Sequence, residues 1–61
     1  MRKTGLYNII ITYIDDSAQE IERVADPKVV TKKETIVISS VNTEAYIKSE
    51  LIKSILIVEL N

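Results

Sequence analysis

The stretch Ile52–Leu60, Ile-Lys-Ser-Ile-Leu-Ile-Val-Glu-Leu, is the densest block of branched apolar residues in the chain. Successive side chains of a strand point to opposite faces of a sheet. One face of this stretch then carries Ile52, Leu56, Val58 and Leu60, interrupted only by Ser54, and the other carries Leu51, Ile55 and Ile57. A strand that is apolar on both faces needs a cover on both. The stretch therefore predicts a strand against which the rest of the chain packs.

The size of the chain limits how both covers are supplied. Its 61 residues form one small domain, 1–61, and domains of this size usually need disulfides, a metal or oligomerisation for stability. The sequence contains no Cys and no His, which excludes disulfides and the usual zinc, copper or haem ligands. We therefore expect a homo-oligomer, in which the second cover of Ile52–Leu60 comes from another subunit unless a closed barrel supplies it.

The charge and hydropathy of the chain exclude several classes of protein. A net charge of −1, from 8 basic and 9 acidic residues, argues against a general nucleic-acid binder, which is normally basic. No stretch reaches the roughly 18 to 20 apolar residues of a membrane span, and no signal peptide is recognisable. These features predict a cytoplasmic protein without a membrane role. The eleven Ile residues and the excess of Lys over Arg suit an AT-rich genome, such as that of a low-GC bacterium or its phage.

Alternating apolar residues and turn signals divide the chain into short strands. Residues 1–5 are expected to be a flexible lead-in. Asp15-Asp16-Ser17, Asp26-Pro27 and the charged Lys32-Lys33-Glu34 are turn or strand-end signals. Strands are expected near 6–14, 18–25, 28–40, 44–48 and 51–60. This spacing predicts a mainly β single domain, a small antiparallel barrel or sandwich of about five short strands.

Two stretches also fit short helices, which leaves an α+β alternative open. Near 17–25, Ser17 and Glu20 have the spacing of a capping box. Near 43–54, Ile47, Leu51 and Ile55 form a stripe at helical spacing. Each helix would be short and marginal alone, so we favour strands at both places.

The sequence offers few catalytic groups. Without His and Cys the usual nucleophile–base pairs cannot be assembled, and a single glycine, Gly5, excludes a glycine-rich phosphate loop. Asp15 and Asp16 are adjacent carboxylates, but no further oxygen ligands stand at a recognisable spacing, so a turn is the better interpretation. We predict a non-enzymatic protein with no catalytic residues, no metal site and no cofactor.

Basic residues in the middle third of the chain, together with two tyrosines, are candidates for binding an anion. A cation beside an aromatic ring is one way to hold a nucleotide. The candidate ligand-binding residues are Tyr13, Arg23, Lys28, Lys32, Lys33 and Tyr46. Surface lysines and core tyrosines are the simpler interpretation of the same residues. The residues predicted to form the core or the subunit contact are Ile9, Ile11, Ile36, Ile38, Ile55, Leu56, Ile57, Val58 and Leu60.

Three functions compete at this stage. The first is a non-enzymatic accessory domain, homo-oligomeric, that binds a protein partner through a strand edge or an apolar face, for instance as a phage or bacterial regulatory or inhibitory protein. The second is a homo-oligomeric protein that sequesters a small anionic ligand such as a signalling nucleotide. The third, nucleic-acid binding by a small barrel, is disfavoured by the net charge.

Overall fold

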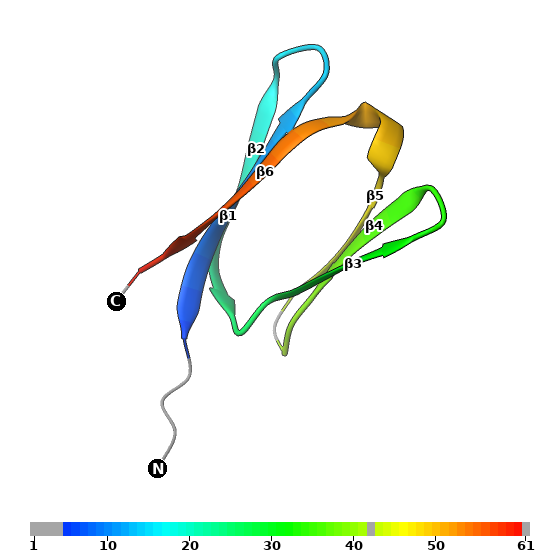
Figure 1. The fold of residues 1–61 in the computed structure, drawn as a ribbon. Helices are drawn as coiled ribbons and strands as arrows, with labels where there is room; N and C mark the ends of the chain where they lie inside the picture. The colour runs from blue at the N-terminus through cyan, green and yellow to red at the C-terminus, as the bar shows by residue number, and fades with distance from the viewer. Residues whose placement is uncertain (1–4, 42, 61) are drawn as a thin grey trace.

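The computed structural model describes residues 5–41 and 43–60, which form six strands and one short 3-10 turn (Figure 1). The elements are β1 (Leu6–Tyr13), β2 (Ala18–Ala25), β3 (Lys28–Lys32), β4 (Thr35–Ser39), β5 (Glu44–Lys48), η1 (Ser49–Leu51) and β6 (Ile52–Glu59). The expected lead-in at 1–5 lies outside the described residues except for Gly5. The Gly5 amide donates to Asp26 Oδ1 at 3.1 Å, and the Gly5 carbonyl accepts from the Asp26 amide at 3.0 Å.

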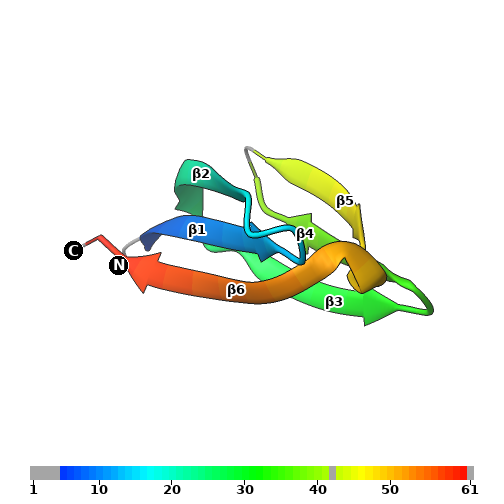
Figure 2. The same cartoon turned by 90° about the horizontal axis from the view of Figure 1, so that it is seen from above.

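The strands form two three-stranded antiparallel sheets, ordered β2-β1-β6 and β3-β4-β5. The middle strand of each sheet pairs with both of the others. This strand is β1 in the first sheet and β4 in the second. Figure 2 shows β6 and β3 on one side of the molecule and β2 and β5 on the other. The sheets are joined by the Asp26-Pro27 connection and by η1.

The expected mainly β fold is confirmed, and the helical alternatives near 17–25 and 43–54 are wrong. Residues 18–25 form β2, and the second stretch forms β5, η1 and β6. The expected strand at 28–40 is two strands, because Lys33 adopts φ 54° and lets a tight turn pair Lys32 with Thr35. The described strands therefore number six rather than five. Within residues 5–41 and 43–60 a barrel is not closed, because no ladder of these residues joins the two sheets.

The place of the C-terminal strand also differs from expectation. β6 is an edge strand that pairs with β1 alone, whereas β1 pairs on both sides. The alternation in β1 explains its central position, since Ile9 and Ile11 share one face and are both fully buried. The apolar content of β6 is only partly used inside one copy of the chain.

The core lies between the two sheets and is small. Four side chains are fully buried: Ile9 and Ile11 from β1, Val24 from β2 and Ile38 from β4. Partly buried apolar side chains surround them, namely Tyr13, Ile21, Ile36, Ala45, Ile47, Ile52 and Ile55. Each fully buried Ile or Val contributes about 1.5–3 kcal/mol from burial. The described chain thus depends on a few side chains that link one sheet to the other.

One side of the space between the sheets is open. Ile57 is the cross-strand partner of buried Ile9, and Val29 is the partner of buried Ile38, so both face the inside. Even so, Ile57 is 43% exposed and Val29 is 38% exposed. Ile57 belongs to β6 and Val29 belongs to β3, and these two strands lie on the same side of the molecule (Figure 2). The described part of the chain does not cover its apolar interior at this side.

The other long edge strand, β2, is interrupted by a β-bulge. The register shifts between Tyr7 and Ile9 of β1, and Arg23 opposite adopts φ 56°. Asn8 supports the bulge, because its Oδ1 accepts from the Arg23 amide at 3.0 Å and its Nδ2 donates to Glu20 Oε2 at 3.1 Å. The Asn8 side chain thus replaces a ladder bond that the bulge removes.

We expect Ile11→Ala to lower the free energy of unfolding by about 2–5 kcal/mol, because it opens a cavity in the four-residue core. Ile14→Ala is the matched control, since Ile14 is exposed and should lose less than about 0.5 kcal/mol. Urea unfolding followed by far-UV circular dichroism measures both. Equal losses for the two variants would contradict the position of the core.

We expect Asn8→Ala to cost about 1 kcal/mol, because the Arg23 amide loses its acceptor within the bulge. Glu20→Ala removes only the exposed side-chain bond to Asn8 and should cost less than about 0.5 kcal/mol. The same urea experiment applies. A Glu20→Ala loss as large as that of Asn8→Ala would show that the amide bond is not what matters.

Candidate functional site

The outer face of the β2-β1-β6 sheet presents a band of apolar side chains. Cross-strand pairing places Leu56 beside Ile10 and Val58 beside Asn8, all on the face opposite the core. Leu6 and Leu60 continue the band, and the Leu60 amide donates to the Leu6 carbonyl at 2.9 Å. We call Leu6, Ile10, Leu56, Val58 and Leu60 the apolar face. Leu56 is 58% exposed, which is unusual for a Leu in the middle of a strand.

The outer face of the β3-β4-β5 sheet has a different character. One row across the strands contains Lys32, Thr35 and Lys48, because Thr35 pairs with both lysines. The next row contains Val30, Val37 and Tyr46, and Tyr46 is 65% exposed. Lys28 and Glu44 lie in the third row, on either side of Ser39. We call Lys28, Val30, Lys32, Val37, Tyr46 and Lys48 the lysine–tyrosine face.

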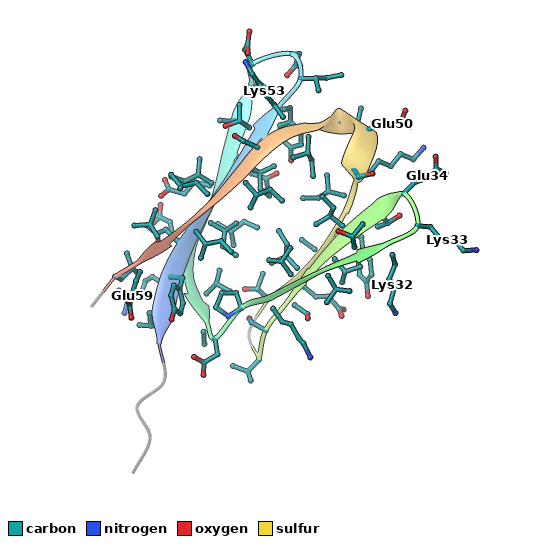
Figure 3. The ribbon with its side chains drawn as sticks, viewed as in Figure 1. Lys32, Lys33, Glu34, Glu50, Lys53 and Glu59 are labelled. Atoms are coloured by element: carbon teal, nitrogen blue, oxygen red, sulfur yellow. The ribbon has the colours of Figure 1, made fainter. Side chains whose placement is uncertain are left out.

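The structure brings together three of the six candidate ligand-binding residues. Lys28, Lys32 and Tyr46 share the lysine–tyrosine face. Lys33 is in the turn between β3 and β4, where Figure 3 shows it at the tip of the hairpin. Tyr13 and Arg23 belong to the other sheet, where the Tyr13 hydroxyl donates to Gln19 Oε1 at 2.8 Å.

Sequence reasoning missed Lys48 as a member of this face. Its position two residues after Tyr46 is a visible signal, because residues i and i+2 of a strand share a face. Its approach to Lys32 depends on Thr35 pairing with both strands, and nothing local in the sequence specifies that pairing.

A carboxylate lies on the same face as these cations. Hydrogen bonding to Glu44, and the negative charge of that carboxylate, raise the pKa of the Tyr46 hydroxyl. The Tyr46 hydroxyl is therefore engaged in a hydrogen bond with Glu44. The negative charge of Glu44 also weakens the positive field that Lys28 and Lys48 create. The face is amphiphilic rather than strongly cationic.

The candidate core and contact residues fall into two groups. Ile9, Ile11 and Ile38 are fully buried, and Ile36 and Ile55 pack against them. The remaining candidates are exposed in the single chain, namely Leu56, Ile57, Val58 and Leu60. The second group carries the apolar surface that one copy leaves uncovered.

A hollow opens at the connection between the sheets. Its volume is about 530 Å³, and it is lined by Tyr7, Asp26, Pro27, Lys28 and Ile57. It lies at the open side of the interior, where Ile57 is exposed. Its lining combines an apolar wall with one acidic and one basic residue.

The adjacent carboxylates Asp15 and Asp16 are used by the turn between β1 and β2. Asp15 Oδ1 accepts from the Ser17 amide at 3.0 Å and from Ser17 Oγ at 2.5 Å. Both bonds lower the pKa of the Asp15 carboxyl, and the bond from Ser17 Oγ has the larger effect. Asp16 Oδ1 accepts from Lys53 Nζ at 2.9 Å. The two carboxylates thus have separate local partners.

No metal centre or membrane-spanning helix is found in the part of the chain that the structure describes. Nowhere in residues 5–41 and 43–60 do three Asp or Glu side chains gather closely enough to hold a metal ion. Over the same ranges, no helix is long and apolar enough to cross a bilayer. No family model, curated protein or solved structure matches the chain.

We expect Ser17→Ala to raise the pKa of Asp15 toward its ordinary value, because the largest cause of the lowered pKa is the bond from Ser17 Oγ. A lowered folded-state pKa adds stability above the unfolded pKa, and this stability is lost as the pH falls through the folded pKa. Side-chain carboxyl NMR titration measures the shift, with Ser39→Ala in the other sheet as the control. An unchanged Asp15 pKa in Ser17→Ala would contradict this assignment.

Proposed function

We propose that the protein is a non-enzymatic, homo-oligomeric accessory protein of the cytoplasm that acts by binding a protein partner. The exposed run in β6 carries the proposal. Leu56, Ile57 and Val58 follow one another, and each is more than a third exposed in the single chain. Contiguous apolar surface on a small protein marks an interaction site.

The two faces of this run have different uses in the proposal. Leu56 and Val58 belong to the apolar face, which Glu20 borders on the β2 side, and which is suited to a protein surface although Asn8 lies within it beside Val58. Ile57 points to the open interior and lines the hollow. A partner that covers the apolar face removes several branched side chains from water at once, which is the main source of affinity in such contacts.

The proposal includes no reaction. The only adjacent carboxylates in the chain serve the turn and an ion pair, and the chain has neither His nor Cys. The surfaces that we propose for binding are, in contrast, the outer faces of both sheets. A role as a phage or bacterial regulatory or inhibitory protein fits this distribution of groups.

Sequestration of a small anionic ligand, such as a signalling nucleotide, is the second candidate. The lysine–tyrosine face favours it, because Lys32 and Lys48 flank Thr35 next to the exposed Tyr46 ring. A phosphate between the lysines and a base on the ring would use this arrangement. Glu44 on the same face makes this the second candidate, and the net charge of −1 makes nucleic-acid binding the third.

The test of the first candidate is partner capture with a matched pair of variants. We expect immobilised wild-type protein to retain a partner from a bacterial lysate, and Leu56→Lys to retain at least about tenfold less, since a charge replaces a Leu that the bound partner would bury. Glu34→Gln is the control, because it changes the charge equally in the turn between β3 and β4. Quantitative mass spectrometry reads the retained proteins. Wild type that captures only itself, or equal capture by Leu56→Lys, would reject the proposal.

The test of the second candidate is calorimetric titration with a panel of cyclic and linear nucleotides. If one binds, Lys32→Gln and Lys48→Gln should each weaken it roughly tenfold, whereas Lys53→Gln, on the other sheet, should not. The affinity should also fall as salt rises, because the contacts are ionic. The absence of heat with every member of the panel would end this candidate.

A further inference from the structure

We propose that two copies of the chain pair through the free edges of β6, antiparallel and centred on Leu56, to form a twofold dimer. The inference rests on the proposed homo-oligomeric function, and it deepens that function by naming the surface through which the copies meet and its register. Four observations carry it: the state of the strand edges, the direction of the free amides in β6, the position of its charges, and the open side of the interior.

Among the described residues there are four edge strands, and β6 is the one whose free edge has no protection from them along its apolar part. Proteins blunt sheet edges with bulges, prolines, charges or short strands. β2 has the bulge at Arg23, β3 follows Pro27 and has a lysine at each end, and β5 is five residues long with a charge at each end. β6 has eight residues, and the uncharged run 54–58 occupies its middle. An edge of this kind is a template for another strand.

The backbone of β6 presents regularly spaced groups at that edge. The Leu60 amide donates to the Leu6 carbonyl, so the amide and carbonyl of Leu60 point toward β1. Strand residues alternate in this respect, and the ladder between β1 and β6 runs without a shift from Tyr7↔Glu59 to Thr12↔Ser54. Ile55, Ile57 and Glu59 therefore direct their amides and carbonyls away from β1, to the free edge.

A twofold axis between two antiparallel β6 strands fixes which residues face each other. With the axis at Leu56, Ile55 faces the partner's Ile57, and both residues direct their backbone groups outward. Such a pair exchanges both hydrogen bonds. Leu56 then faces the partner's Leu56 as a pair without hydrogen bonds, in which the side chains lie close together.

The charges of β6 select this register over its neighbours. Lys53 and Glu59 stand at the two ends of the strand, as Figure 3 shows, with only uncharged residues between them. Centring on Leu56 places Lys53 opposite the partner's Glu59 twice, once at each end. Centring on Ile57 places Ile55 opposite the partner's Glu59, and centring on Ile55 places Lys53 opposite the partner's Ile57. Opposite charges across strands stabilise a pair, and a charge opposite an apolar residue does not.

The existing contact of Lys53 does not compete strongly with this arrangement. Lys53 is the extra residue of a small irregularity, between the pairs Thr12↔Ser54 and Tyr13↔Ile52. Its ion pair with Asp16 joins side chains that are 60% and 78% exposed, and exposed pairs of this kind are weak. The lysine is long enough to turn along the free edge.

The pairing also covers surface that one copy leaves open. Ile57 faces the interior yet is exposed, and it would lie beside the partner's Ile55. The two apolar faces become continuous, because Leu56 of each copy lies at the centre of the extended sheet. The dimer therefore enlarges the surface on which the proposed protein partner docks.

A cysteine at the axis tests the register directly, because the chain has no native Cys. Leu56→Cys should form an intermolecular disulfide under mild oxidation, since the Cα atoms of such a pair lie about 4.5 Å apart, within disulfide range. Sedimentation equilibrium should give a dimer for wild type. Non-reducing mass spectrometry should give a dimer mass for oxidised Leu56→Cys, and an unchanged thermal melt shows that the variant is folded.

Other cysteines separate this register from its neighbours. Val58→Cys should not cross-link to itself, but a mixture of Val58→Cys and Ser54→Cys should give the mixed dimer, because these positions face each other. Faster cross-linking of Ile57→Cys or Ile55→Cys than of Leu56→Cys would overturn the register. A monomeric wild type together with no cross-link in any variant would overturn the pairing itself.

A charge swap gives an independent readout without cysteine. Lys53→Glu and Glu59→Lys should each raise the dimer Kd at least about tenfold, and the double variant should restore it to within about threefold of wild type. Asp16→Asn should leave the Kd unchanged, which separates the intersubunit pair from the Lys53–Asp16 pair. No recovery in the double variant would contradict the register. If the wild type is monomeric but still captures a protein partner through Leu56, the pairing and the homo-oligomeric state both fail, and only the proposed binding of a protein partner stands.

Discussion

Packing of four fully buried side chains, Ile9, Ile11, Val24 and Ile38, holds the two sheets together, and the rest of the structure depends on it. The chain has no Phe, Trp, Cys or His with which to enlarge or reinforce this core. Six short strands surround this core as two small sheets, and the described structure leaves one side of the interior open. The small core therefore limits the stability of the protein and also determines its surface, since apolar residues that one copy cannot bury remain at the edge and the outer face of β6.

The small core also explains why the outer faces of the two sheets differ so much. β6 is rich in branched apolar residues, and β1 can cover only one of its edges. The outer face of the β3-β4-β5 sheet instead surrounds Val37 and Tyr46 with lysines and Glu44, so this face can remain exposed to solvent. We infer that association belongs to the first sheet, whereas the second sheet is available for a polar or anionic ligand.

The strands were predictable because their signals are local. Alternation in Leu6–Tyr13, the Asp15-Asp16-Ser17 turn and the Asp26-Pro27 connection each define a boundary within a few residues. The charged Lys32-Lys33-Glu34 indicated a turn or strand end within 28–40, but the tight turn that divides this stretch depends on the positive φ of Lys33, which a lysine does not predict. Strand order was not predictable for a related reason: both β1 and β6 are apolar on two faces, and only pairing decides that β1 is central. The grouping of the candidate site residues was not predictable for the same reason. Lys28, Lys32 and Tyr46, together with the missed Lys48, come together only through cross-strand register.

Amide hydrogen exchange in β6, measured as a function of protein concentration, tests the central claim most directly. The amides of Ile55, Ile57 and Glu59 point away from β1, so a single copy leaves them open to water. The account predicts that these three amides are protected at high concentration and lose protection on dilution through the dimer Kd, while the amides of Leu56 and Val58 stay protected by β1. Fast exchange of Ile55, Ile57 and Glu59 at every concentration would contradict it.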